Sequence, residues 1–280
     1  MRPHRVTFIA AAAAGAISAA CAVTVDEDHF FYPGPAFTTA VPEIPPVTVE
    51  RLSIAVADGA TLGGVRLGQA NADLEILYFG GNASRADDMV AFLGPLLSGT
   101  RANLTMIDYR GYGRSTGTPT IATLKADALA VLDRLRDRAG ATPIVVHGVS
   151  LGGFVAAYVA ANRAIQGLVL EATAPDAQTW AANQVPAVAK PFVRLHIAPA
   201  LLDENNVEAL KRYAGPLLLI AGSKDKITPP RFLQQLFDAS LSPHKHVVVA
   251  NGARHGAALL QPEARKAFDQ FLDVVRADAR

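Results

Sequence analysis

A regular alternation of short apolar runs with longer stretches of helical periodicity constrains this chain more than any other feature of its sequence. The apolar runs lack polar alternation, which is typical of strands buried on both faces of a sheet. They occupy residues 74–79, 104–107, 143–146, 167–170, 217–220 and 246–250. The helical stretches occupy residues 85–97, 120–138, 151–163, 229–239 and 262–277. This order predicts βαβ units, and therefore an α/β fold with a mostly parallel sheet and helices on both faces.

The composition is that of a globular protein. Of the 280 residues, 50% are hydrophobic and 18% are charged, whereas disordered chains are poor in hydrophobic residues and highly charged. The net charge of +1 lacks the basic excess of a phosphate-binding surface, so nucleic acid is not an expected partner. The single cysteine cannot form an intramolecular disulfide, and no nucleotide-binding or metal-binding motif occurs, so no cofactor is expected.

The first 20 residues have the pattern of a secretory signal peptide. Arg2 and Arg5 precede an uncharged, alanine-rich stretch at residues 6–20, and a segment of this kind is removed after export. The stretch is shorter than the ~20 apolar residues that span a bilayer as a helix. This length disfavours the alternative of a transmembrane anchor.

The signal pattern ends in Ser18-Ala19-Ala20-Cys21, which resembles the end of a bacterial lipoprotein signal. In such signals the cysteine is lipidated and becomes the first residue of the mature chain. The resemblance implies a lipid anchor at Cys21, membrane contact through that anchor, and a location in the cell envelope. Simple cleavage at a nearby Ala-x-Ala site, which yields a periplasmic protein, is the alternative.

The rest of the chain divides into an arm and a larger domain. Residues 21–46 are rich in proline and aromatic residues, which do not support a helix and predict an extended arm packed along the body. The domain is expected to span residues 47–280 and to begin with a β-hairpin at 47–56 and 61–67. Residues 172–213 break the alternation with several prolines and no clean strand, and predict a small lid over the carboxyl edge of the sheet.

Ser150 is the strongest candidate for a catalytic residue. It lies in Gly148-Val149-Ser150-Leu151-Gly152, between the expected strand at 143–146 and the expected helix at 151–163. In this context Gly-x-Ser-x-Gly is a nucleophile elbow, a sharp turn whose glycines let the strand and helix backbones approach closely. A tight glycine turn with an N-capping serine is the alternative.

A serine nucleophile requires a base and an acid farther along the chain. His255 is the candidate base because it follows the last expected strand in a loop with glycines on both sides. Asp225 follows the strand at 217–220 and is the candidate acid, which gives the order Ser, Asp, His. Glu171, at the end of the strand after the elbow helix, is a second candidate acid. The alternative role for Asp225 is a cap of the helix at 229–239.

Acyl transfer also requires N–H groups that stabilise the oxyanion, and the loss of one such donor costs ~3 kcal/mol. Leu151, the residue after the nucleophile, supplies one candidate N–H. The loop after the strand at 74–79 reads Gly80-Gly81-Asn82. Asn82 is the expected second donor, with Gly81 as the alternative, and a tight strand exit without a catalytic role also fits the glycine pair.

Several motifs, in this order along the chain, resemble those of a known family. They are 77–83 (LYFGGNA), 108–115 (DYRGYGRS), 148–153 (GVSLGG), 222–225 (GSKD) and 252–255 (GARH). Residues 47–278 thereby resemble the α/β-hydrolase superfamily, and in particular its small-lidded branch, which includes protein depalmitoylating thioesterases and bacterial serine esterases.

The resemblance implies the α/β-hydrolase fold and a role for each candidate residue. Ser150 is then the nucleophile, Asp225 and His255 are its partners, and the N–H groups of Asn82 and Leu151 are the oxyanion donors. The family histidine before the Gly-Asn pair is Gly80 here. The second motif is expected to be a structural turn in which Arg110 forms an ion pair.

These observations predict an exported serine hydrolase that cleaves a carboxylic ester or thioester through an acyl-enzyme. Its substrate is expected to be a small or acylated molecule. Apolar residues of the predicted lid favour an apolar acyl group, namely Trp180, Val185, Phe192, Leu195 and Ile197. The alternatives are a serine peptidase and a noncatalytic envelope lipoprotein that retains the fold.

Overall fold

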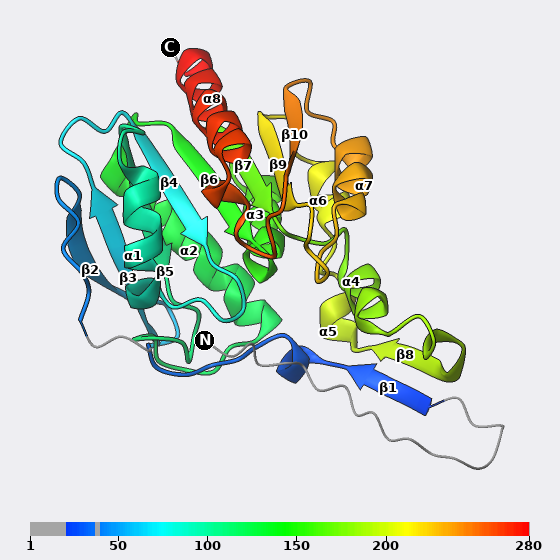
Figure 1. Cartoon of the computed structure of the whole chain (residues 1–280). Helices are drawn as coiled ribbons and strands as arrows, with labels where there is room; N and C mark the ends of the chain where they lie inside the picture. Colours follow the sequence, from blue (N-terminus) through cyan, green and yellow to red (C-terminus); the bar gives the residue numbers. More distant parts are fainter. Residues whose placement is uncertain (1–20, 37–39, 280) are drawn as a thin grey trace.

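The computed structural model describes residues 21–36 and 40–279, and the signal peptide predicted for residues 1–20 lies outside them (Figure 1). The centre is an eight-stranded sheet with the strand order β10-β9-β7-β6-β4-β5-β3-β2. Its strands are β2 (Thr48–Ala55), β3 (Thr61–Gly68), β4 (Leu74–Phe79), β5 (Ala102–Ile107), β6 (Ile144–Val149), β7 (Gly167–Glu171), β9 (Leu217–Gly222) and β10 (Lys245–Ala250).

The sheet is parallel except at one edge. Strand β2 pairs antiparallel with β3, and β3 pairs antiparallel with β5, while all other neighbours in this sheet run parallel. The hairpin expected at 47–56 and 61–67 is therefore confirmed, as is the mostly parallel sheet. The six strands from β4 to β10 are the short apolar runs of the sequence.

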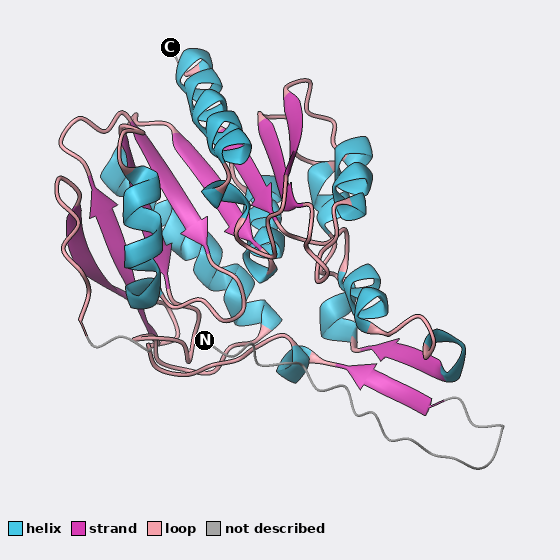
Figure 2. Ribbon diagram, viewed as in Figure 1, coloured by secondary structure: helices cyan, strands magenta, loops and turns pink. Residues whose placement is uncertain are grey.

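Helices cover both faces of this sheet (Figure 2). Side chains of successive strand residues point to opposite faces, so Leu77 and Phe79 pack in one apolar core, and Ile76 and Tyr78 in the other. The first core also takes side chains from α2 (Ile121–Ala139), α3 (Leu151–Asn162) and α7 (Arg231–Ala239). The second takes them from α1 (Ala86–Leu97) and α8 (Pro262–Asp278).

The strand order reverses at β4, in the middle of the sheet. Strand β4 lies between β5 and β6, so the chain moves from β4 to one neighbour and then crosses back to the other. In open α/β sheets, ligands bind outside the carboxyl ends of the strands at such a switch point. The loops after β4 and β6 contain Asn82 and Ser150, which this topology brings to the same edge.

The segment at 172–213 contains a strand that the sequence did not predict. It comprises α4 (Ala177–Gln184), a turn of 3-10 helix at Lys190–Phe192, β8 (Val193–Ile197), α5 (Pro199–Leu202) and α6 (Asn206–Leu210). Strand β8 pairs in parallel with β1 (Cys21–Val25), at the start of the predicted arm, and the two form a separate small sheet. The expectation of no strand in this segment is wrong because the partner of β8 lies far away in the sequence.

The arm also departs from a fully extended conformation. Residues Glu27–His29 form one turn of 3-10 helix, capped by the side chain of Asp26. The expectation that the arm does not support a helix is wrong for this turn, which contains no proline. After the turn, Phe30 and Phe31 are buried in the core shared by α2 and α3, so this part of the arm packs on the body.

The expected ion pair of Arg110 is confirmed. Its guanidinium donates to Asp127 on α2, at 2.7 and 2.8 Å, and to Asp58 in the turn between β2 and β3, at 2.6 and 3.2 Å. These contacts raise the pKa of Arg110. Arg110 thus ties the β5–α2 loop to the antiparallel edge and to a helix, which is a structural role.

Candidate active site

Ser150 lies at the junction of β6 and α3 in a strained conformation. Its φ is 57° and its ψ is −116°, which non-glycine residues rarely adopt. A Cβ on Gly148 would overlap the backbone of Gly152, and a Cβ on Gly152 would overlap the carbonyl of Phe79 on β4. The glycines around Ser150 are therefore required for the close approach of α3 to the sheet.

Three of the predicted residues form a continuous hydrogen-bonded relay. Nε2 of His255 lies 3.0 Å from Oγ of Ser150, and Nδ1 of His255 lies 2.8 Å from Oδ2 of Asp225. His255 is in the β10–α8 loop, and the flanking Gly252 and Gly256 both have positive φ, 73° and 65°. The structure thus brings together Ser150, Asp225 and His255 from the ends of β6, β9 and β10.

Asp225 is held as a carboxylate that faces the imidazole. Its side chain is fully buried, whereas that of His255 is 25% exposed. Oδ1 accepts the N–H groups of Ile227 and Thr228, and Oδ2 accepts the Thr228 hydroxyl at 2.8 Å. Burial raises the pKa of this carboxyl, but the hydrogen bonds from His255 and Thr228 outweigh it and leave the pKa below its ordinary value. Asp225 also stabilises the turn before α7, and this role does not compete with the contact to His255.

The predicted oxyanion loop passes directly beside the nucleophile. A Cβ placed on Gly81 would lie 3.4 Å from Cβ of Ser150. Leu151 is the first residue of α3, where N–H groups have no acceptor within the helix. In the part of the chain that the structure describes, the backbone N–H groups of Asn82 and Leu151 donate no internal hydrogen bond. Both are therefore free to bind a ligand oxygen.

The side chain of Asn82 fixes the shape of this loop. Its Oδ1 accepts the hydroxyl of Tyr112 at 2.7 Å and the backbone N–H of Tyr32 at 3.1 Å. The hydroxyl of Tyr109 donates to the carbonyl of Gly80 at 2.7 Å. Two tyrosines of the DYRGYGRS motif and the backbone of one arm residue therefore hold the loop in place.

Sequence reasoning missed these supporting residues. Thr228 carried a local signal, because its position three residues after Asp225 is the spacing of a short-range side-chain bond. Tyr112 lies in the DYRGYGRS motif, which the sequence predicts to be a structural turn. Tyr32 carried no signal, since it lies 50 residues from Asn82 and acts through its backbone.

Glu171, the alternative acid, has other partners. Its Oε2 lies 3.3 Å from Nε2 of His147, and its Oε1 accepts the N–H of Ala258 at 3.2 Å. Both side chains of the His147–Glu171 pair are almost fully buried. The structure therefore places Asp225, and not Glu171, at the candidate base.

Apolar side chains gather one helical turn from the nucleophile. Phe154, on the first turns of α3, clusters with Phe232 of α7 and with the half-buried Trp180 of α4. The ring centroid of Trp180 also lies 4.8 Å from that of Phe30 in the arm. Phe192, which the sequence placed with these residues, is instead 68% exposed. Phe192 therefore lies outside this cluster, and its expected contact with an acyl group stays a prediction.

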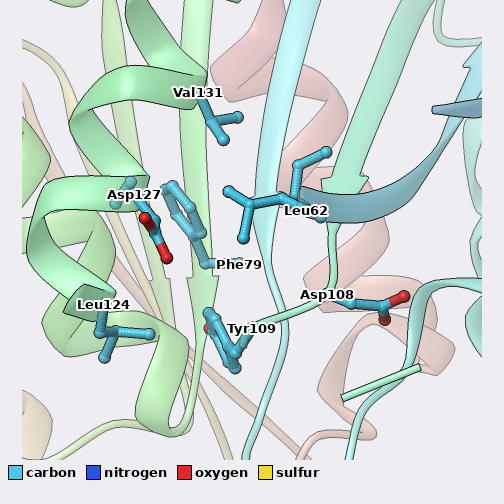
Figure 3. A pocket seen from close by; sticks show the side chains of 9 residues that line it. Leu62, Phe79, Asp108, Tyr109, Leu124, Asp127 and Val131 are labelled. Carbon is cyan, nitrogen blue, oxygen red and sulfur yellow. The ribbon is translucent and has the colours of Figure 1, made fainter. Parts of the chain in front are cut away.

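A small cavity of about 20 Å³ lies elsewhere, between α2 and the sheet. Figure 3 shows Phe79, Leu62, Leu124 and Val131 converging on it. This volume accommodates about one water molecule, and no residue of the Ser–His–Asp relay lines it. The cavity is thus a packing defect beside the Arg110–Asp127 ion pair and not a substrate site.

Among residues 21–36 and 40–279, no group of three or more His, Cys, Asp or Glu side chains is arranged to hold a metal ion. Within the same ranges, no helix combines the length and the apolar character needed to cross a membrane. Cys21 is the first described residue and begins β1.

Sequence comparisons relate the chain to known proteins. A family profile described as "alpha/beta hydrolase fold" matches residues 76–199. An uncharacterised protein of Mycobacterium tuberculosis is 31% identical over 233 residues, which cover 81% of this chain and 78% of that protein. Protein bem46 of Schizosaccharomyces pombe is 30% identical over 195 residues, which cover 67% of this chain. The matched region spans 64% of the length of bem46.

Solved structures share the fold at lower identity. An esterase of Pyrococcus furiosus, Pf2001, superposes with a TM-score of 0.70 over 86% of this chain and 98% of its own, at 18% sequence identity. This similarity shows that the two proteins share a fold.

Proposed function

This chain belongs to the alpha/beta hydrolase fold family, and on that premise we propose that it is a serine hydrolase that cleaves carboxylic esters or thioesters. The observation that carries the proposal is the relay in which Nε2 of His255 lies 3.0 Å from Oγ of Ser150 and Nδ1 lies 2.8 Å from Oδ2 of Asp225. The Pyrococcus protein that shares this fold is an esterase, which agrees with this reaction class. Membership of the family supports hydrolase activity but does not specify the nucleophile or the bond that is cleaved.

In the proposed acylation step, Oγ of Ser150 attacks the acyl carbonyl while Nε2 of His255 takes its proton. The carboxylate of Asp225 stabilises the resulting imidazolium and fixes the neutral tautomer whose Nε2 is free to accept. The N–H groups of Asn82 and Leu151 then bind the oxyanion of the tetrahedral intermediate. Collapse of this intermediate breaks the bond to the alcohol or thiol, which leaves with the proton from His255.

Deacylation repeats the same proton transfers with water. His255 takes a proton from a water molecule while the oxygen of that water attacks the acyl carbon of the ester on Ser150. The bond to Oγ breaks, and Ser150 recovers its proton from His255. The products are a carboxylic acid and the free enzyme, so no cofactor is consumed.

We propose an apolar acyl group for the substrate. The cluster of Phe154, Phe232 and Trp180 lies close to the nucleophile along α3, and because the two phenylalanines are buried, the half-buried Trp180 is its member that an acyl chain can contact. The polar groups nearest Ser150 in the relay, His255 and Asp225, are already hydrogen-bonded to each other.

The proposed reaction is tested with a fluorophosphonate probe followed by a p-nitrophenyl ester series from acetate to palmitate. We expect the probe to label Ser150 and the ester series to show turnover, with a preference among acyl lengths. The Ser53→Ala variant, which removes an exposed hydroxyl on the edge strand β2, is the matched control and retains labelling. An unlabelled wild-type protein without ester turnover would contradict the proposal and favour a noncatalytic envelope protein.

We also propose that the chain is exported and anchored in the cell envelope by a lipid on Cys21. The proposal rests on the signal pattern of residues 1–20 and on the Ser18-Ala19-Ala20-Cys21 sequence at its end. It is independent of the reaction at Ser150.

Replacement of Cys21 by alanine tests this anchor. Metabolic labelling with a fatty-acid analogue is expected to tag the wild type, whereas Cys21→Ala stays untagged and accumulates as the unprocessed precursor. The absence of label in the wild type, or normal maturation of Cys21→Ala to a periplasmic form, would leave ordinary secretion as the better description.

A further inference from the structure

The small sheet of β1 and β8 presents large apolar side chains to solvent at one of its ends. The two strands run parallel, and Cys21 is paired with Val193. We call residues 186–194 the lid tip. They comprise the segment just before β8 and the first two residues of that strand. Within the lid tip, Val188 is 83% exposed and Phe192 is 68% exposed. Exposed apolar residues that gather in one place mark interaction sites more often than chance.

The charge around the lid tip has a single sign. Residues 177–202 contain no aspartate or glutamate, although the whole chain has 25 acidic residues against 26 basic ones. Lys190 and Arg194 are exposed within the lid tip, and β1 is uncharged. The acidic residues Asp26, Glu27 and Asp28 follow the other end of β1, roughly 13 Å away along a strand. The lid tip therefore combines apolar and basic side chains within a segment of the chain that contains no acidic residue.

The chain enters the small sheet at the same end. The apolar stretch at residues 6–20 is followed directly by Cys21, the first residue of β1, with no intervening linker. Figure 1 shows β1 and β8 at the periphery, beyond α4 and α5 and away from the eight-stranded sheet. Any membrane attachment at or before Cys21 would bring the lid tip, and not the opposite edge of the domain, against the bilayer.

We propose that the lid tip is a docking surface for a bilayer that contains anionic phospholipids. Val188 and Phe192 enter the boundary between headgroups and acyl chains, and Lys190 and Arg194 bind the lipid phosphates. The surface orients the domain so that the lid segment, which connects β7 to β9 beside Ser150, lies next to the membrane. This inference goes beyond the proposed reaction and does not depend on it.

A tryptophan at position 192 reports directly on this docking. The native chain has one tryptophan, so the full chain is prepared with Trp180→Phe and Cys21→Ala, and then with either Phe192→Trp or Leu241→Trp. Leu241 is the matched control because it is 66% exposed and lies in the loop before β10. That loop is at the amino ends of the parallel strands, whereas the lid segment follows the carboxyl end of β7. Vesicles of phosphatidylethanolamine and phosphatidylglycerol with brominated acyl chains are expected to quench the Phe192→Trp variant severalfold more than the Leu241→Trp variant.

A charge variant tests the same surface without a new aromatic residue. Lys190→Gln/Arg194→Gln is expected to lower partition into these vesicles roughly tenfold at low salt. Lys211→Gln/Arg212→Gln removes two exposed charges after α6, which packs on α3 and α7, and is expected to change partition little. Equal quenching at positions 192 and 241, or equal losses in the two charge variants, would overturn the proposal. Self-association that depends on Phe192, without quenching, would assign the lid tip to a second copy of the chain and would also overturn it.

Discussion

The Ser150→Ala variant is expected to lose at least ~10³-fold in ester turnover, because nucleophile, base and acid act as one unit. Its thermal stability is expected to stay close to that of the wild type. The hydrogen bond that the Ser150 hydroxyl makes with a described residue is to the partly exposed His255, and alanine keeps the same strained backbone. Turnover of p-nitrophenyl esters and thermal unfolding of the same preparations measure both effects.

A second substitution at this position separates chemistry from strain. Ser150→Gly removes the hydroxyl as well, but glycine tolerates a φ of 57° without a Cβ penalty. We expect Ser150→Gly to be as inactive as Ser150→Ala. We also expect it to unfold at a higher temperature than Ser150→Ala. If Ser150→Ala kept a tenth of wild-type turnover, the nucleophile would lie elsewhere and the elbow would have only a structural role.

Local patterns were sufficient to predict most of the fold. Apolar runs without alternation identify the buried parallel strands, because their positions depend on side chains within a few residues of each other. The same holds for the elbow, where the glycines at 148 and 152 are required by the contacts of α3 with β6 and β4. The positions of Ser150, Asp225 and His255 after the parallel strands β6, β9 and β10 were then enough to place them at one edge.

Long-range pairing was not predictable in the same way. Strand β8 has an alternating sequence, but its partner β1 is about 170 residues earlier and has no charged residue or turn that would mark the pairing. The contact of the Tyr32 backbone with Asn82 is independent of the tyrosine side chain, so the residue type at position 32 contains no information about it. Such contacts require the assembled fold.

The choice between Asp225 and Glu171 was decided by loop geometry. Glu171 is the last residue of the buried strand β7, Asp225 follows the buried strand β9, and both have a histidine partner. The partner of Glu171 is His147 on the neighbouring strand β6, which is buried away from the nucleophile hydroxyl. Among the residues that the structure describes, it is the β10–α8 loop, with its two positive-φ glycines, that brings an imidazole between an acid and Ser150.

Asp225→Asn is expected to lower kcat by up to ~10⁴-fold, the loss known for the equivalent change in another triad enzyme. The amide nitrogen of asparagine would face Nδ1 of His255 as a donor, which favours the tautomer with its proton on Nε2. That proton would face Oγ of Ser150, so His255 could no longer accept from the nucleophile. Steady-state turnover of the preferred p-nitrophenyl ester measures the loss, and Glu171→Gln is the control expected to retain most of its activity.

The same variant gives a pH-dependent stability signature. Because the pKa of Asp225 is lower in the folded state than its ordinary value, its carboxylate stabilises the fold at a pH above the unfolded value of about 3.9. This stabilisation is lost as the pH falls through the lower folded-state pKa. The difference in unfolding free energy between the wild type and Asp225→Asn is therefore expected to narrow below about pH 4. A larger loss of kcat in Glu171→Gln than in Asp225→Asn, with a difference in unfolding free energy that does not vary with pH, would move the acid to Glu171 and leave Asp225 as a helix cap.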